Sequence, residues 1–161
     1  MANIEDIISA AKITCLKRRV NLTSKREVIL RAIVGSNIPL SAYEIIDICR
    51  IEHDLIITPM SIYRMLNVLE EHHLIHRLKS ANKYIACIHM NCGHDHKFPQ
   101  FLICKVCGNV KEFDIEESTI ESLKKSILSA GFKSNEMQLE LESICNACHE
   151  KHDDIHDENK V

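Results

Sequence analysis

The chain contains no tryptophan, and its three tyrosines and four phenylalanines make up only 4% of its 161 residues. Any hydrophobic core must therefore be built mainly from isoleucine and leucine. A chain of this length forms one ordinary domain or two small ones. Small domains bury a modest fraction of their surface, so a core this thin in each half indicates support from a metal ion, disulfides or a second subunit.

The sequence also lacks a secretory signal and a long apolar run. The first residues, MANIEDIISAAK, include acidic side chains where a signal peptide needs an apolar stretch. No apolar segment approaches the roughly twenty residues that span a bilayer. We therefore expect a cytoplasmic protein with no membrane partner. Thiols stay reduced in that compartment, so clustered cysteines more often bind metal than form disulfides.

The charges are divided unevenly along the chain, whose overall net charge is −3. Residues 1–86 contain 12 Lys and Arg against 9 Asp and Glu, a net charge of +3, whereas residues 87–161 contain 8 against 14, a net charge of −6. A mildly basic first half can approach phosphate groups while the acidic half stays away from them. We expect the tail, 149–161, to be disordered, because it is nearly devoid of apolar residues.

Residues 1–86 have the pattern of short helices followed by a β-hairpin. The expected helix caps are Thr23, the Ser41–Glu44 capping box, and Thr58 followed by Pro59. The expected inner helical faces contain Ile4, Ile7, Ile8, Ala11, Cys15 and Leu16, then Val28, Ile29, Ala32 and Ile33, and later Ile62, Leu66 and Leu69. Two short strands, 74–78 and 84–88, follow. This order predicts a winged helix-turn-helix.

The second half has a different pattern. We expect strands at 98–104 and 110–114, an amphipathic helix at 116–130 that Gly131 ends, and a third strand at 132–142. The predicted fold class is therefore α+β. An N-terminal winged helix-turn-helix domain, 1–86, precedes a small α/β domain, 87–148.

The strongest local signal is a pair of C-x-x-C motifs formed by Cys104, Cys107, Cys145 and Cys148. Each motif suits a tight turn that lets both thiolates face one ion, and four thiolates in tetrahedral array suit Zn²⁺. Such a closed site leaves no open coordination position, so we assign it to structure. A thioredoxin-like redox site is not indicated, because the βαβ pattern is missing.

A second group of donors lies at the junction of the two halves. Five candidate ligands fall within the ten residues 87–96: Cys87, His89, Cys92, His94 and His96. Two more candidates, His76 and Glu112, are in reach. Mixed donors of this kind suit a second zinc site. Any single histidine here is more often solvated, so the prediction depends on the density of donors. A metal at this junction could change the relative placement of the domains.

The start of the fourth helix is the candidate DNA-binding element. If Ile62, Leu66 and Leu69 face inward, the outward residues are Met60, Tyr63, Arg64 and Asn67. Exposed residues early in a recognition helix contact base edges and phosphates, so we predict contacts from Ser61, Tyr63 and Arg64. Expected phosphate contacts elsewhere are Lys25, Arg26 and Lys79. A solvated helix face is the alternative, but the surrounding winged-helix pattern favours DNA.

Together these motifs resemble the ferric uptake regulator family of metal-dependent repressors. The matching segments run in family order from about Ala10 to His149: Leu22-Thr23-x-x-Arg26, Leu40-Ser41-Ala42-Tyr43-Glu44, Ser61-Ile62-Tyr63-Arg64-x-Leu66, His94-x-His96, Ile103-Cys104-x-x-Cys107-Gly108-x-Val110-x-Glu112, and Ile144-Cys145-x-x-Cys148. The resemblance implies a homodimer joined through the second domain, which binds a palindromic operator on double-stranded DNA and takes no small-molecule substrate.

The resemblance also implies a sensing site. Zinc-sensing members place ligands at the positions that His76, Cys87, His96 and Glu112 occupy here. The segment after Cys87 is about two residues longer than the family pattern, which keeps His94, Cys92 and His89 as further candidates. Iron-sensing members carry a histidine and a glutamate where this chain has Pro39-Leu40 and Tyr84-Ile85. A thiolate ligand likewise favours zinc over iron(II) or manganese.

The predicted function is zinc-responsive repression of zinc-uptake genes. The alternative within the family is an iron-, manganese- or peroxide-responsive regulator. We do not expect an enzyme: a zinc deaminase pairs H-x-E with P-C-x-x-C, and neither C-x-x-C motif here follows a proline. A zinc-knuckle interaction module with no DNA role is disfavoured by the winged-helix half.

Overall fold

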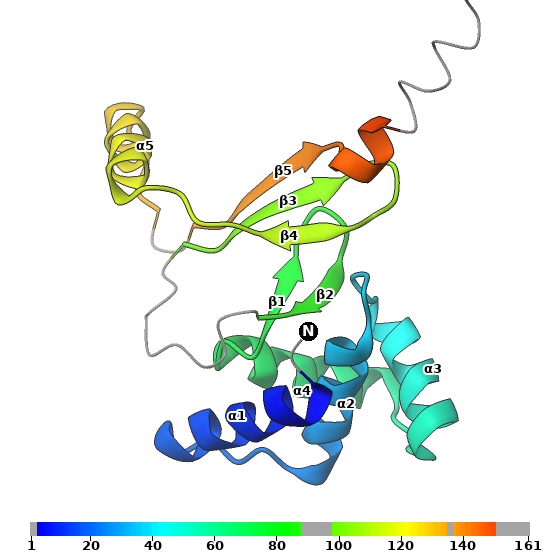
Figure 1. The fold of residues 1–161 in the computed structure, drawn as a ribbon. Coiled ribbons are helices and arrows are strands. Elements are labelled where there is room, and N and C mark those ends of the chain that lie inside the picture. The colour runs from blue at the N-terminus through cyan, green and yellow to red at the C-terminus, as the bar shows by residue number, and fades with distance from the viewer. Residues whose placement is uncertain (1–2, 88–97, 135–136, 151–161) are drawn as a thin grey trace, which may run out of the picture. The chain divides into compact units, whose positions relative to one another are not determined.

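The computed structural model of the chain describes residues 3–87, 98–134 and 137–150 (Figure 1). The chain divides into two compact units, Met1–His94 and Asp95–Val161. The predicted domain boundary between residues 86 and 87 stays a prediction, as does the disordered tail. In chain order the elements are α1 (Ile4–Lys17), α2 (Ser24–Gly35), α3 (Ala42–His53), α4 (Pro59–Glu71), β1 (Ile75–Leu78), β2 (Lys83–Ala86), β3 (Gln100–Cys104), β4 (Val110–Glu112), α5 (Glu117–Ser129) and β5 (Leu139–Ser143).

Helices α2, α3 and α4 begin where the sequence predicts, because side chains cap their N-termini. Thr23 and Thr58 each accept a hydrogen bond from the backbone N–H three residues on. Ser41 and Glu44 form the predicted capping box: the Glu44 N–H donates to Ser41 Oγ at 3.3 Å, and the Ser41 N–H donates to the Glu44 carboxylate at 2.6 Å. No helix that the structure describes has both the length and the apolar character needed to cross a membrane.

The core of the first unit is aliphatic, as the scarcity of aromatic residues predicts. The predicted inner face of α4 is confirmed, because Ile62, Leu66 and Leu69 are all buried. Helix α2 packs on α1, α3 and α4, and its buried residues are Ile29, Leu30, Ala32 and Ile33, whereas the predicted Val28 is half-buried.

The predicted inner face of α1 is wrong at both ends. The buried stripe is Ile8, Ala11 and Cys15. Leu16 is 77% exposed, and Ile4 is 40% exposed. Successive helical residues differ in direction by about 100°, so Leu16 points away from the stripe that Cys15 continues.

The wing is tied to the helix-turn-helix. Strands β1 and β2 pair antiparallel, and Leu40, just before α3, forms an additional bridge with Tyr84 of β2. Their backbone groups exchange two hydrogen bonds of 2.7 and 3.0 Å. The Lys83 ammonium lies 3.4 Å from the carboxylate of Glu44. Strand β2 is therefore joined to the start of α3 as well as to β1.

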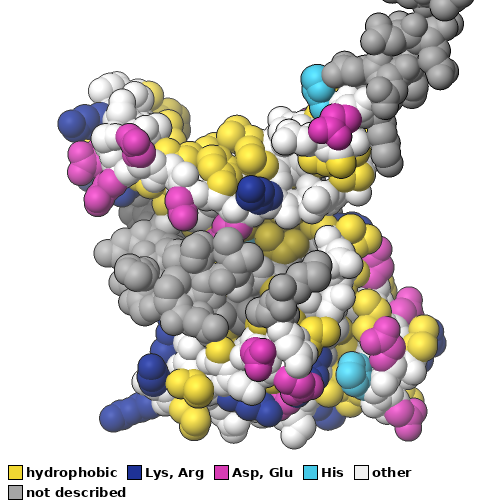
Figure 2. Space-filling model, in the orientation of Figure 1, with side chains coloured by type: hydrophobic (Ala, Val, Ile, Leu, Met, Phe, Trp, Pro, Cys, Tyr) yellow, Lys and Arg dark blue, Asp and Glu magenta, His cyan; other side chains and the backbone are white. Residues whose placement is uncertain are grey.

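The second unit contains a three-stranded sheet in the order β4-β3-β5. Strand β3 pairs antiparallel with β4 and parallel with β5. The third strand begins at Leu139, later than the start predicted at Phe132, which is exposed. Within the described chain α5 has no buried residue, and its apolar stripe is at most half-buried: Leu123 and Leu128 are exposed, and Ile120 and Ile127 are half-buried. Hydrophobic side chains also gather over the sheet of this unit (Figure 2).

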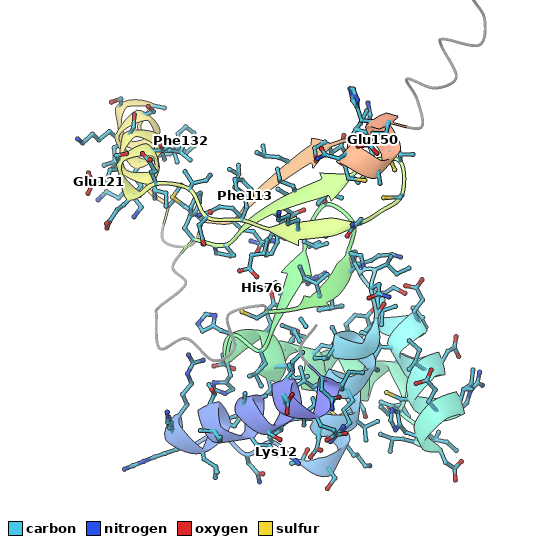
Figure 3. All side chains as sticks on the ribbon, in the orientation of Figure 1. Lys12, His76, Phe113, Glu121, Phe132 and Glu150 are labelled. Carbon is cyan, nitrogen blue, oxygen red and sulfur yellow. The ribbon has the colours of Figure 1, made fainter. Side chains whose placement is uncertain are left out.

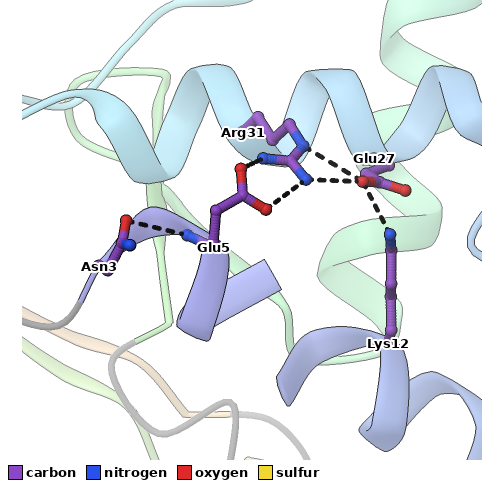
Figure 4. Close-up of polar contacts among 5 residues, drawn as sticks. All are labelled: Asn3, Glu5, Lys12, Glu27 and Arg31. Carbon is purple, nitrogen blue, oxygen red and sulfur yellow. Dashed lines mark hydrogen bonds and ion pairs between the residues drawn. The ribbon is translucent and has the colours of Figure 1, made fainter. Parts of the chain in front are cut away.

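An ion-pair network joins α1 to α2 (Figure 4). Arg31 reaches the Glu5 carboxylate at 2.5 and 3.0 Å and Glu27 at 3.0 Å, and Lys12 reaches Glu27 at 2.9 Å. The hydrogen bond from Lys12 is the largest cause that lowers the pKa of Glu27, and Arg31 lowers the pKa of Glu5. A carboxylate whose pKa is lowered on folding contributes stability above its unfolded pKa and loses it on protonation.

We predict that Arg31→Met destabilises the first unit by about 1 kcal/mol at pH 7, since it breaks a network rather than one exposed pair. The deficit should stay unchanged as the pH falls to the ordinary carboxyl pKa of 4.5, and shrink below it as Glu5 and Glu27 become protonated through their lowered pKa values. Urea denaturation followed by helical circular dichroism measures both effects. Arg50→Met is the matched control, because among the described residues Arg50 pairs with Asp47 alone, on the exposed face of α3. Equal losses in the two variants would contradict the prediction.

Candidate metal centres and nucleic-acid interface

Four cysteine sulfurs meet in the second unit, and the structure confirms that the two C-x-x-C motifs lie together. Cys104, Cys107, Cys145 and Cys148 place their Sγ atoms within 4.8 Å of one another. The topology explains this meeting. Strands β3 and β5 are parallel neighbours with Cys104 opposite Ser143, so both motifs follow the same end of the sheet.

Backbone hydrogen bonds shape each turn. The Gly108 N–H donates to the Cys104 carbonyl at 2.9 Å, and the Cys104 N–H donates to the Asn109 carbonyl at 2.8 Å. Gly108 has a φ of 72°, in the left-handed region that glycine adopts without steric cost. The second motif continues into a helical turn over 146–150, in which the Cys148 N–H donates to the Cys145 carbonyl at 2.9 Å.

The electrostatics of the cluster suit a cation. Backbone N–H groups of Cys107 and Cys145 donate to Cys104 Sγ and lower its pKa to about 6; the donor of Cys145 lies 3.3 Å away. The Cys148 thiol hydrogen-bonds to the neighbouring sulfurs, Cys145 foremost. These bonds stabilise its protonated form and raise its pKa to about 12. Cys107 and Cys145 bring their sulfurs to 3.7 Å. Four converging sulfurs can hold one thiophilic ion tetrahedrally and leave no position open for a substrate.

The first unit contributes a second pair of donors, from the wing. His76 projects from β1 (Figure 3). It lies opposite Ile85 of β2, and Cys87 follows two residues beyond Ile85. Residues two apart on a strand share a face, so His76 and Cys87 are diagonal neighbours. Their ligand atoms lie within 4.8 Å of each other, and both side chains are buried. The hairpin therefore presents one nitrogen and one sulfur donor together.

The other predicted sensing ligands are distributed differently. Glu112 belongs to the second unit, where it is a buried residue of β4 opposite Phe101. A buried carboxylate is costly unless it is paired with a cation or metal. His89, Cys92, His94 and His96 lie outside the described residues. The structure thus brings together His76 and Cys87, and the complete ligand set stays a prediction.

The candidate DNA-binding residues lie on an open helix face. Ser61, Tyr63 and Arg64 are all exposed on α4. Lys25 and Lys79 are exposed as well. The half-buried Arg26 instead donates to the carbonyl of Asn21 at 2.7 Å, so part of its guanidinium holds the segment that enters α2.

Arg18 is a contributor that sequence reasoning missed. Its Nη1 donates to the carbonyl of His72, the C-cap of α4, at 2.7 Å. A cation at a helix C-terminus satisfies a carbonyl and complements the helix dipole. Arg18 therefore ties the end of α4 to the end of α1. No local pattern predicts a contact between residues 54 positions apart.

A winged helix-turn-helix, followed by a unit with a four-thiol centre, is the architecture of a metal-dependent DNA-binding regulator. The model of the ferric uptake regulator family matches residues 17–142. The chain belongs to the ferric uptake regulator family, as the sequence motifs indicate.

Individual relatives agree with this assignment. The chain is 30% identical over 144 residues to the zinc uptake regulation protein of Escherichia coli K12, covering 89% of this chain and 82% of that protein. It is 32% identical over 159 residues to the ferric uptake regulation protein of Campylobacter upsaliensis, covering 94% and 96%. A solved zinc uptake regulator complexed with zinc and DNA superimposes with a TM-score of 0.83 at 26% identity, covering 95% of this chain and 99% of that one.

We predict that Cys104→Ser removes the metal of the four-cysteine cluster and unfolds the second unit, because binding free energy at such a site is also folding free energy. Bound metal per chain, measured by mass spectrometry after desalting, should fall by at least one ion, and near-complete proteolysis of residues after Gln100 should follow. Cys49→Ala, a buried thiol of α3 outside the cluster, is the control. A protease-resistant Cys104→Ser protein with unchanged metal content would refute the structural role.

Proposed function

We propose that this protein is a zinc-responsive transcriptional repressor of zinc-uptake genes. The observation that carries the proposal is the buried pair of His76 and Cys87 on the wing. A sulfur donor beside an imidazole suits zinc, whereas iron(II) and manganese prefer harder ligands. The similarity to the E. coli zinc uptake regulation protein supports the same choice of metal.

The proposed zinc sites have separate roles. Cys104, Cys107, Cys145 and Cys148 hold a structural zinc, for which four thiolates are a fitting donor set. His76, Cys87, His96 and Glu112 form the regulatory site. His94, Cys92 and His89 remain further candidate ligands of that site. The closed structural site supplies no catalytic position, so the protein acts by binding rather than by catalysis.

The proposed partner is double-stranded DNA, bound as a palindromic operator by a homodimer in the cytoplasm. Ser61, Tyr63 and Arg64 of α4 contact bases and phosphates, and the phosphate contacts elsewhere come from Lys25, Arg26 and Lys79. The net charge of +3 on residues 1–86 favours this approach. The unburied apolar stripe of α5 supports pairing of two chains through the second unit, 87–148.

A metal bound at His76 and Cys87 can act on the DNA-binding helices, because the wing that carries these ligands is bonded to them. Strand β2 is bonded to Leu40 and, through Lys83, to Glu44 at the start of α3. Ligands on the wing are therefore fixed to the helix-turn-helix, while Glu112 is fixed to the sheet of the second unit. An ion held by both sets restrains the two units together. It favours DNA binding only to the extent that it binds the operator-competent state more tightly.

A second candidate is an iron-, manganese- or peroxide-responsive regulator. The 32% identity to the Campylobacter upsaliensis ferric uptake regulation protein favours the iron-responsive form. Operator binding titrated against buffered Zn²⁺ and against Fe²⁺ separates the two. The zinc proposal requires Zn²⁺ to activate binding at a free concentration at which Fe²⁺ does not.

We predict that Cys87→Ser leaves the fold and the structural zinc intact but removes zinc-dependent operator binding. The hydroxyl is a far poorer zinc ligand than a thiolate, so binding should weaken by at least about tenfold at the free zinc concentration that half-activates the unmodified protein. Fluorescence anisotropy under buffered zinc measures this. Cys15→Ala, a buried thiol of α1, is the control and should respond normally. An unchanged zinc response in Cys87→Ser would overturn the regulatory assignment.

A further inference from the structure

The exposed face of α4 carries an apolar side chain, Met60, that has no part in the DNA contacts proposed for Tyr63 and Arg64. Met60 is 70% exposed. It lies in the first turn of α4, and residues three and four positions on in a helix share its face, so Met60 stands beside Tyr63 and Arg64. The buried residues Ile62 and Leu66 occupy the opposite side. Met60 is thus the first large side chain of the DNA-facing stripe.

Met60 also contacts the arginine of that stripe. Nη2 of Arg64 donates to Sδ of Met60 at 3.7 Å, one helical turn away. The contact places the Met60 thioether and the Arg64 guanidinium next to each other on the exposed face of α4.

An exposed methionine at this position needs an apolar partner to become buried. The major groove offers base edges that are almost entirely polar, and the C5-methyl group of thymine is the exception. The first residues of a recognition helix approach base edges most closely. The side chain of methionine is long and flexible enough to follow a methyl group there.

We propose that Met60 is a specificity-determining residue that reads a thymine methyl group in each operator half-site, beside the base pair contacted by Arg64. This inference rests on the proposed DNA-binding function and names part of the sequence that the protein selects. Duplex DNA is therefore the partner that covers the Met60 side chain. The net charge of +3 on residues 1–86 agrees with a polyanionic partner.

The test replaces single thymines by uracil, which removes only the C5-methyl group. The probe is a duplex selected from a random-sequence library by the zinc-loaded, full-length protein at 0.15 M salt. Each thymine of one half-site is replaced in turn, and affinity is measured by fluorescence anisotropy. One replacement should weaken binding by about fourfold, the value of one buried methyl group. Met60→Ala should make the protein insensitive to that replacement.

Two variants separate Met60 from its surroundings. Met60→Leu retains apolar reach and should keep most of the sensitivity to uracil. Ile51→Ala, which truncates a 75% exposed apolar residue of α3, should keep the full wild-type response. The urea midpoint of Met60→Ala should equal that of the unmodified protein, because an exposed side chain contributes little to the core.

The outcomes distinguish the inference from the function on which it rests. Failure of the full-length protein to select any duplex overturns both. A selected duplex whose thymines all tolerate uracil overturns the role of Met60 alone, as does a Met60→Ala protein that keeps the fourfold response. Loss of the response in Tyr63→Ala with retention in Met60→Ala would assign the methyl contact to Tyr63 and overturn the inference.

Discussion

The convergence of four cysteine sulfurs is the constraint on which the second unit depends. Among its described residues, the buried apolar side chains are only Phe101, Cys104 and Cys148, and two of these belong to the cluster. So small a core cannot offset the conformational entropy of a folded unit. We propose that an ion bound by the four thiolates supplies the missing free energy. The sheet that carries Glu112 and the helix proposed for dimerisation both depend on that ion.

The first unit is held differently, by an aliphatic core and by ties between distant segments. Leu40 pairs with Tyr84, and Arg18 holds the carbonyl that ends α4. These contacts join the wing and the exposed helix face to the same packed body. The wing that carries His76 and Cys87 is therefore packed on the same body as α4. We propose that a metal bound on the wing acts on the DNA-binding helix through this body.

Local chemistry made much of this predictable. Caps such as Thr23 and the inner face of α4 depend on residues within one or two turns, and the C-x-x-C spacing directly indicates the cluster of four cysteines. Properties that depend on distant partners were not predictable. The exposure of Leu16, the late start of β5 and the contact of Arg18 are set by packing between segments far apart in the chain. An apolar stripe likewise does not reveal that α5 would stay at most half-buried.

The central claim is that operator binding requires a second zinc in addition to the structural ion. Native mass spectrometry of the protein–DNA complex tests this most directly, because it counts chains, duplexes and metal ions in one species. The account predicts two chains and one duplex with four zinc ions, two per chain, and a metal-depleted dimer with two zinc ions that does not bind the duplex. An abundant complex of the dimer and the duplex with only two zinc ions would contradict it.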